Sequence, residues 1–295
     1  MFTRIDARPR PAGGRADRHI VLVTVTDQEE ARSRTDVSDG AARTTRQTMQ
    51  GFPFVTAEEI RKINDLAADR YGLERAQLLE VAGARLAAMA TEILGVLESR
   101  EQVRPFCVVC GPGDNGAAGL IAARHLQSSG YRARTVVTQP DEEMREFNRI
   151  RLHTLELMDV QILRPDTGPG GPGIPMEKTP SLLLDALIGC GIEGELDPGM
   201  GRLVRWMNNV GVPILSLDVP SGLDPTTGEH GANCVKAHTT MTLALPKMGL
   251  LDPSSRQFVG RLILADIGIP RILYRELGLE VTGRFPPGGR MSLLV

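Results

Sequence analysis

Short, almost continuous apolar runs recur along this chain from about residue 105. Runs of this length, separated by amphipathic segments, are typical of strands buried on both faces of a mainly parallel sheet. The pattern predicts strands at residues 105–110, 132–138, 159–163, 181–186, 213–218, 238–244 and 261–266.

The segments around these runs have helical periodicity. Thr56-Ala-Glu-Glu59 is a capping box that opens a first helix. A second helix is predicted over 74–98, with an apolar stripe that includes Ala82, Leu86 and Met89. Further helices are predicted at 116–129, 141–157 and 200–209. Helices alternating with strands indicate an α/β fold with helices on both faces of the sheet.

The two ends of the chain lack this regularity. Residues 1–48 mix arginine with acidic, serine and threonine residues, which predicts a disordered extension or a misassigned start with Met49 as the true beginning. The acidic residues argue against an arginine-rich transit peptide. The ordered domain is predicted over 49–280. The tail at 281–295 is expected to be loose because it is rich in Gly and Pro.

Composition narrows the class of protein. The chain has 295 residues, 41% hydrophobic and 24% charged, with a formal net charge of -2. These values are ordinary for a globular protein and favour neither a nucleic acid nor a membrane as partner. Its four cysteines are too few for a disulfide scaffold of this size, so we expect reduced thiols in a cytoplasmic protein. Cys107 and Cys110 lie in one predicted strand and should point to opposite faces, which excludes them as a metal pair.

A glycine-rich turn joins the first of these strands to the helix that follows. It reads Gly-Pro-Gly-Asp-Asn-Gly over 111–116. Such a turn exposes backbone N–H groups at the positive end of a helix, where phosphate or another anion can bind. The spacing matches neither a G-x-G-x-x-G fingerprint nor a Walker loop. A turn of this kind also serves simple packing, so its role depends on what stands at the neighbouring strand ends.

Polar residues do stand at those ends, where open parallel sheets bind ligands. Asp185 ends one predicted strand, Asp218 and Ser221 follow another, and Lys247 follows a third. Asp185 and Lys247 are our candidate catalytic residues. Each residue also has a structural interpretation, because Asp and Ser stabilise turns and a lysine can be a solvated surface residue.

Taken together, six segments resemble the NAD(P)H-hydrate epimerase family, also called the YjeF N-terminal domain. The similarity spans about residues 56–270. The resemblance implies a Rossmann-like three-layer α/β/α sandwich with a mainly parallel central sheet. It implies an isomerase that interconverts the R and S forms of hydrated NADH or NADPH, called NAD(P)HX, in cofactor repair. The segments are 78–83, 111–116, 123–126, 185–191, 218–222 and 244–249.

The resemblance also implies a site. A potassium ion would be held by Asn115, Asp185 and Ser221. We further hypothesise that Asp185 transfers a proton to the departing C6 hydroxyl and takes one from the returning water. The residues implied to contact the dinucleotide are Asp114, Asn115, Gly116, Ala117, Ala118, Gly189, Cys190, Gly191, Ile192, Glu193, Gly194, Glu195 and Asp218.

Partners are implied in the same way. The S form would be consumed by a separate NAD(P)HX dehydratase, and the protein would be a homodimer. Nucleic acid and membrane are not expected as partners.

The chain departs from the family in the glycine-rich turn, where Asp114, Ala117 and Ala118 replace Asn, Gly and Asp. Two hypotheses therefore stand side by side. One is an active epimerase that tolerates the altered turn. The other is a non-catalytic nucleotide-binding or scaffold protein with a degenerate site.

Overall fold

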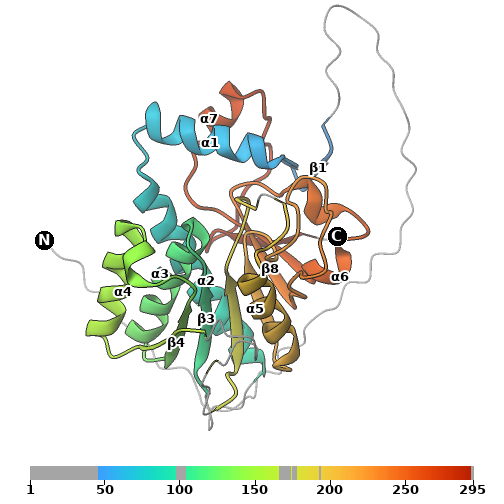
Figure 1. Cartoon of the computed structure of the whole chain (residues 1–295). Coiled ribbons are helices and arrows are strands. Elements are labelled where there is room, and N and C mark those ends of the chain that lie inside the picture. The colour runs from blue at the N-terminus through green and yellow to red at the C-terminus, as the bar shows by residue number, and fades with distance from the viewer. Residues whose placement is uncertain (1–45, 98–103, 166–173, 175–177, 193, 294–295) are drawn as a thin grey trace, which may run out of the picture. The chain divides into compact units, whose positions relative to one another are not determined.

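The apolar runs of the sequence form the strands of one central sheet (Figure 1). The structure is a computed structural model, and it describes residues 46–97, 104–165, 174, 178–192 and 194–293. The sheet strands are β3 (Phe106–Cys110), β4 (Ala133–Val137), β5 (Gln161–Leu163), β6 (Leu182–Ala186), β7 (Ile214–Leu217), β8 (Thr239–Leu243), β9 (Arg261–Ala265) and β10 (Arg290–Leu293). Their order is β10-β9-β8-β7-β6-β3-β4-β5, and all neighbours are parallel except the antiparallel pair of β9 and β10. The predicted mainly parallel sheet is confirmed.

Helices cover both faces of this sheet. Phe106 and Val108 belong to a core cluster that includes residues of α2 and α3, whereas Cys107 and Val109 pack with residues of α5 on the opposite face. This alternation is the period of two expected for a strand buried on both faces. The result is the predicted three-layer sandwich. The helices are α1 (Ala57–Asp69), α2 (Arg75–Leu97), α3 (Asp114–Ser128), α4 (Glu146–Leu157), α5 (Pro198–Asn209), α6 (Arg256–Val259) and α7 (Arg271–Glu276).

The strand order reverses between β3 and β6. From β3 the chain proceeds through β4 to the edge strand β5, then returns to β6 and continues through β7 and β8. In an open parallel sheet such a switch point leaves a crevice at the carboxyl ends of the two strands. The glycine-rich turn after β3 and the segment after β6 therefore meet there.

Two glycines allow this close approach. A Cβ on Gly111 would stand 1.9 Å from the carbonyl oxygen of Leu187, and one on Gly116 would stand 1.8 Å from that of Gly111. Side chains at these positions would collide with backbone atoms. The turn is therefore packed directly against the segment that follows β6.

Two predicted elements were wrong. Residues 290–293, placed in a loose tail, form β10 and pair with β9, because the chain returns to the open edge of the sheet. The predicted helix 141–157 is divided into a 3-10 turn (η1, Asp141–Glu143) and α4. Between them the backbone is extended at Met144, whose side chain is thereby buried.

The start of the first helix is bound to loops that follow β7 and β8. A short hairpin, β1 (Thr48–Met49) and β2 (Phe52–Pro53), precedes it. Val55 pairs with Lys247, and the N–H of Ala57 donates to Thr226 Oγ1 at 3.0 Å. Arg46 binds the carbonyl of Phe54, so contacts to the domain start before Met49. Residues 1–45 of the predicted extension lie outside the described residues.

Candidate functional site

Asp185 lies near the carboxyl end of β6, fully buried. Its Oδ1 accepts hydrogen bonds from Ser221 Oγ (2.6 Å) and the N–H of Leu187 (3.3 Å). Its Oδ2 accepts from Ser216 Oγ (2.8 Å) and the N–H of Ser221 (3.0 Å). Burial raises the pKa of Asp185, and the four hydrogen bonds oppose that rise without cancelling it. Among the described residues, no basic side chain pairs with this carboxyl group.

Asp218, directly after the neighbouring strand β7, and Lys247, after β8, form a second buried group. Their ion pair leaves 11% of the Asp218 side chain and 1% of the Lys247 side chain exposed. The ammonium also donates to the carbonyl of Leu243 at 2.7 Å. Burial acts to raise the pKa of Asp218, but Lys247 and the hydrogen bonds to the carboxylate together lower it. Lys247 is therefore not a solvated surface lysine.

Two tight turns set the direction of this pair. Asp218 has a φ of 67°, and the N–H of Val219 bonds to the carbonyl of Leu217 at 2.9 Å. Ala244 at the end of β8 repeats the arrangement, with a φ of 62°. Such γ-turns are uncommon and strained for residues other than glycine. Strain at two adjacent strand ends is typical of a site whose side chains must be held in place.

The segment after β6 joins the two groups. The N–H of Ile188 donates to Ser221 Oγ at 3.0 Å. A Cβ on Gly189 would lie 3.0 Å from Asn115 Oδ1 and 3.1 Å from Asp218 Oδ2. The N–H of Cys190 faces the same Asp218 oxygen at 3.4 Å. The predicted residues from the glycine-rich turn, from the segment after β6 and from the end of β7 therefore converge.

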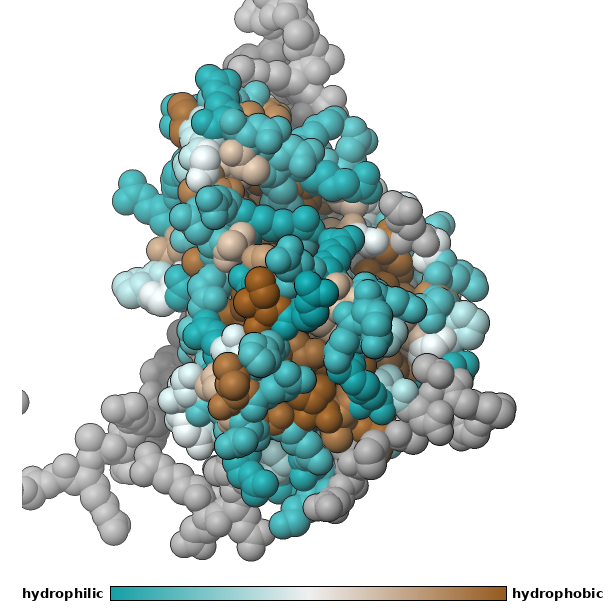
Figure 2. All heavy atoms as spheres, turned by 60° about the vertical axis from the view of Figure 1, so that its left-hand side comes forward, coloured by the Kyte–Doolittle hydropathy of each residue, from teal (hydrophilic) through white to brown (hydrophobic). Residues whose placement is uncertain are grey.

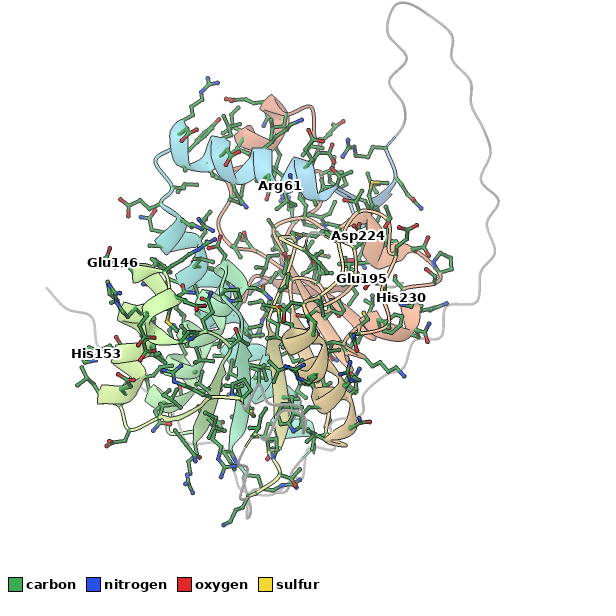
Figure 3. All side chains as sticks on the ribbon, in the orientation of Figure 1. Arg61, Glu146, His153, Glu195, Asp224 and His230 are labelled. Carbon is green, nitrogen blue, oxygen red and sulfur yellow. The ribbon has the colours of Figure 1, made fainter. Side chains whose placement is uncertain are left out.

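Other predicted residues stand apart. The side chains of Ala117 and Ala118 are buried in the core, and the N–H of Ala117 bonds to the carbonyl of Gly113 within the helix. Glu195 is exposed and lies near Gly231, on the side of the molecule that carries Asp224 and His230 (Figure 3). Gly191 and Gly194 are exposed, Ile192 is half-buried, and Glu193 lies outside the described residues.

Three residues of the site were missed by sequence analysis. Ser216 is the one polar residue of β7 and is paired in register with Asp185. This pairing can be predicted only when the order of the strands in the sheet is known. Asn148 of α4 is buried and donates to the carbonyls of Pro112 and Gly113, fixing the glycine-rich turn. Arg75 pairs with Asp114 from 39 residues away. No local pattern links these residues to their partners.

We expect Ser216→Ala to lower the free energy of unfolding by about 1–2 kcal/mol at neutral pH, because the buried carboxylate loses one hydrogen bond. The loss also raises the pKa of Asp185 further, so the folded state binds its proton more readily than the unfolded chain does. The destabilisation should then be largest above the folded-state pKa of the variant. It should shrink as the pH falls toward about 4, through the folded-state pKa values of variant and native protein, because below them both folded proteins hold the proton. Urea unfolding across this range measures it. Ser254→Ala, which removes an exposed serine bonded to Asp252, is the matched control and should cost little at either pH.

Beyond this site, the described residues form a hollow beside α4. It contains none of the predicted site residues and lies on the side of the molecule that carries α4 (Figure 1), which Figure 2 brings forward. The hollow is lined by Asp141, Arg149, Ile150, Leu152, His153 and Glu156. Within the described segments, no group of three or more His, Cys, Asp or Glu side chains is placed to hold a metal ion. In the same part of the chain, no helix combines the length and apolar character needed to cross a membrane.

Comparison with known proteins gives consistent matches. Residues 75–249 match the family model described as YjeF-related protein N-terminus. An NAD(P)H-hydrate epimerase of Dehalogenimonas lykanthroporepellens is 36% identical over 234 residues, covering 78% of this chain and 88% of that protein. An NAD(P)H-hydrate epimerase of Truepera radiovictrix is 36% identical over 230 residues, covering 77% of this chain and 94% of that protein. 

Longer relatives and a solved structure complete the comparison. A bifunctional NAD(P)H-hydrate repair enzyme Nnr of Dictyoglomus turgidum is 30% identical over 219 residues, which cover 74% of this chain and 40% of that protein. The crystal structure of yeast ynu0 superimposes with a TM-score of 0.70 at 24% identity, covering 81% of this chain and 99% of that one. The yeast structure supports the fold alone.

Proposed function

Since this chain belongs to the family of the YjeF-related protein N-terminus, we propose that it is an NAD(P)H-hydrate epimerase, which interconverts the R and S forms of NAD(P)HX. Relatives named as epimerases match over most of their own length. The observation that carries the proposal is the pair of buried carboxyl groups at the switch-point edge of the sheet, one with a cationic partner and one without.

The two carboxyl groups suit different roles because their surroundings move their pKa values apart. The pKa of Asp185 is raised by burial, so this residue is the better proton donor. The pKa of Asp218 is lowered beside Lys247, so this residue stays ionised. A fixed anion stabilises positive charge that develops on the reduced nicotinamide ring when C6 loses its hydroxyl.

The proton is proposed to move through Ser221. Asp185 and Ser221 are both fully buried, so the substrate touches neither in this conformation, and the transfer requires the segment after β6 that covers them to move. Ser221 Oγ lies 2.6 Å from Asp185 Oδ1 and bonds to that segment, which makes it the group through which the proton can pass. A proton given to the C6 hydroxyl lets it leave as water. Water then adds to either face of the ring cation and returns a proton to the carboxylate, so atoms and charge balance.

A potassium ion fits the chemistry of the residues proposed to hold it. Asn115, Asp185 and Ser221 offer amide, carboxylate and hydroxyl oxygens, the ligands that hard cations prefer. The buried Asp185 carboxyl group also has no basic partner among the described residues. A bound monovalent cation would supply positive charge beside this carboxyl group and oppose the rise in its pKa, so that the group could both give and take a proton.

The scaffold hypothesis rested on the altered turn, and the contacts of that turn weaken it. The methyl groups of Ala117 and Ala118 pack in the core, and the charge of Asp114 is paired with Arg75. None of the three substitutions leaves an uncompensated group in the site. Together with the relatives named as epimerases, this favours the enzyme.

The proposal is tested by epimerisation with the purified full chain. An NADPHX sample enriched in one epimer is incubated with the protein and potassium, and the R/S ratio is followed by chromatography. Re-equilibration far above the spontaneous rate supports the enzyme. A folded protein that produces no acceleration would contradict it and return the search to binding partners.

The proposed function also implies a partner enzyme. The chain spans about two fifths of the length of the bifunctional relatives. We propose that a separate NAD(P)HX dehydratase consumes the S form. A homodimer and a cytoplasmic location remain predictions.

A further inference from the structure

An ion pair stands at the mouth of the glycine-rich turn. Asp114 is the first residue of α3, and its carboxylate is contacted by both Nε and an NH2 group of Arg75, the first residue of α2. The Arg75 side chain is 62% exposed and the Asp114 side chain is 43% exposed. The pair therefore lies at the surface beside the proposed dinucleotide site.

Arg75 cancels the negative charge of Asp114. A lone carboxylate at this point would repel a phosphate group that approaches the turn. With Arg75 beside it, the pair is neutral. The remaining N–H groups of the guanidinium have no acceptor among the described residues, so they are free to donate to an added anion.

We propose that Arg75, oriented by Asp114, binds a phosphate group of the dinucleotide substrate; this rests on the proposed function. Guanidinium groups bind phosphate through paired hydrogen bonds, which makes arginine suited to this task. Asp114 acts on substrate through Arg75 and is a positioning residue. Because Arg75 lies away from the buried carboxyl groups, it affects binding rather than the chemical step.

Kinetics with NADPHX at controlled ionic strength test the proposal. Arg75→Gln should raise KM about 10- to 100-fold and change kcat less than about threefold. The rise in KM has two causes: the phosphate loses a charged hydrogen bond, and the unpaired Asp114 carboxylate repels it. Raising the salt concentration should shrink the difference. Arg70→Gln, which breaks the exposed pair with Glu276, is the matched control and should leave KM unchanged.

The Asp114→Asn background separates the two contributions of Arg75. There, Arg75→Gln should still raise KM, but by less than in the native background, because the repelling charge is gone. An unchanged KM for Arg75→Gln in the native background would overturn the proposal. So would a normal KM in the double variant, since Arg75 would then only neutralise Asp114.

Failure of the proposed function and failure of the proposed phosphate contact give different results. If the unmodified protein does not accelerate epimerisation, that function fails. The same five proteins are then compared by thermal shift with NADPH. Stabilisation that is reduced by Arg75→Gln but not by Arg70→Gln supports the phosphate contact, and equal shifts contradict it.

Discussion

Asp185→Asn is expected to reduce epimerase kcat by about 10²- to 10⁴-fold, the usual contribution of a positioned proton donor and acceptor. The amide has nearly the shape of the carboxyl group but cannot give up or take the proton. Epimerisation of NADPHX measures the loss. Binding of NADPH, followed by thermal shift, should be retained.

The hydrogen bonds around Asp185 explain why this variant should still fold. The amide oxygen can replace Oδ2, which accepts from Ser216 and from the N–H of Ser221. The amide NH2 can then replace Oδ1, because the Ser221 hydroxyl can rotate to accept from it. Only the long 3.3 Å bond from Leu187 is lost. We expect a fall in the free energy of unfolding of no more than about 2 kcal/mol.

Ser221→Ala is the companion variant, since the proton is proposed to pass through that hydroxyl. A kcat loss similar in size to that of Asp185→Asn supports the relay. Retention of native kcat in a folded Asp185→Asn protein would refute proton transfer by Asp185, and the reaction would need another proton donor.

Lys247→Met is expected to lower the free energy of unfolding by about 3–5 kcal/mol at neutral pH, because it leaves the buried Asp218 carboxylate without its cation. Methionine fills similar space, so lost packing contributes little. Urea unfolding measures the change. Lys62→Met, which removes an exposed lysine paired with Glu58, is the control and should cost less than about 1 kcal/mol.

The pH dependence of the free energy of unfolding shows whether lost charge pairing or lost packing destabilises Lys247→Met. The lowered pKa of Asp218 contributes stability that is present above the unfolded-state pKa and lost as pH falls through the folded pKa. Without Lys247 that contribution disappears, so the difference between variant and native protein should shrink in acid. A difference that is constant with pH would mean that packing, not charge, is responsible.

A double variant separates charge from shape. Asn has nearly the shape of Asp, so Asp218→Asn should add no strain to the γ-turn beyond that already present at residue 218. Combined with Lys247→Met, it removes the unpaired charge and should recover part of the lost stability. Purely additive losses would contradict a buried ion pair as the main contribution.

Much of the fold was predictable from the chain. The seven predicted strands became β3 to β9, because apolar and β-branched residues, including the threonines of β8, favour a strand buried on both faces. The capping box at Thr56–Glu59 opens α1 as predicted. By contrast β10 was missed, since an edge strand needs no continuous apolar run and its residues 290–293 follow a Gly- and Pro-rich segment.

The site was predictable only in part. Asp185, Asp218 and Lys247 could be selected because polar groups at strand ends are conspicuous after apolar runs. Their pairing could not: Lys247 meets Asp218 across neighbouring strands, while Asp185 is left with serines. The chain also gave no sign that Arg75 would neutralise Asp114.

The amino-acid sequence alone thus determined the elements, the layers and the candidate polar residues, because periodicity and capping act over a few neighbouring residues. The tertiary structure decided which carboxyl group is ionised, which is fully buried and which cations stand beside the glycine-rich turn. Those properties depend on desolvation and on charges brought together from distant parts of the chain, and both arise only when strands β3, β6, β7 and β8 lie side by side.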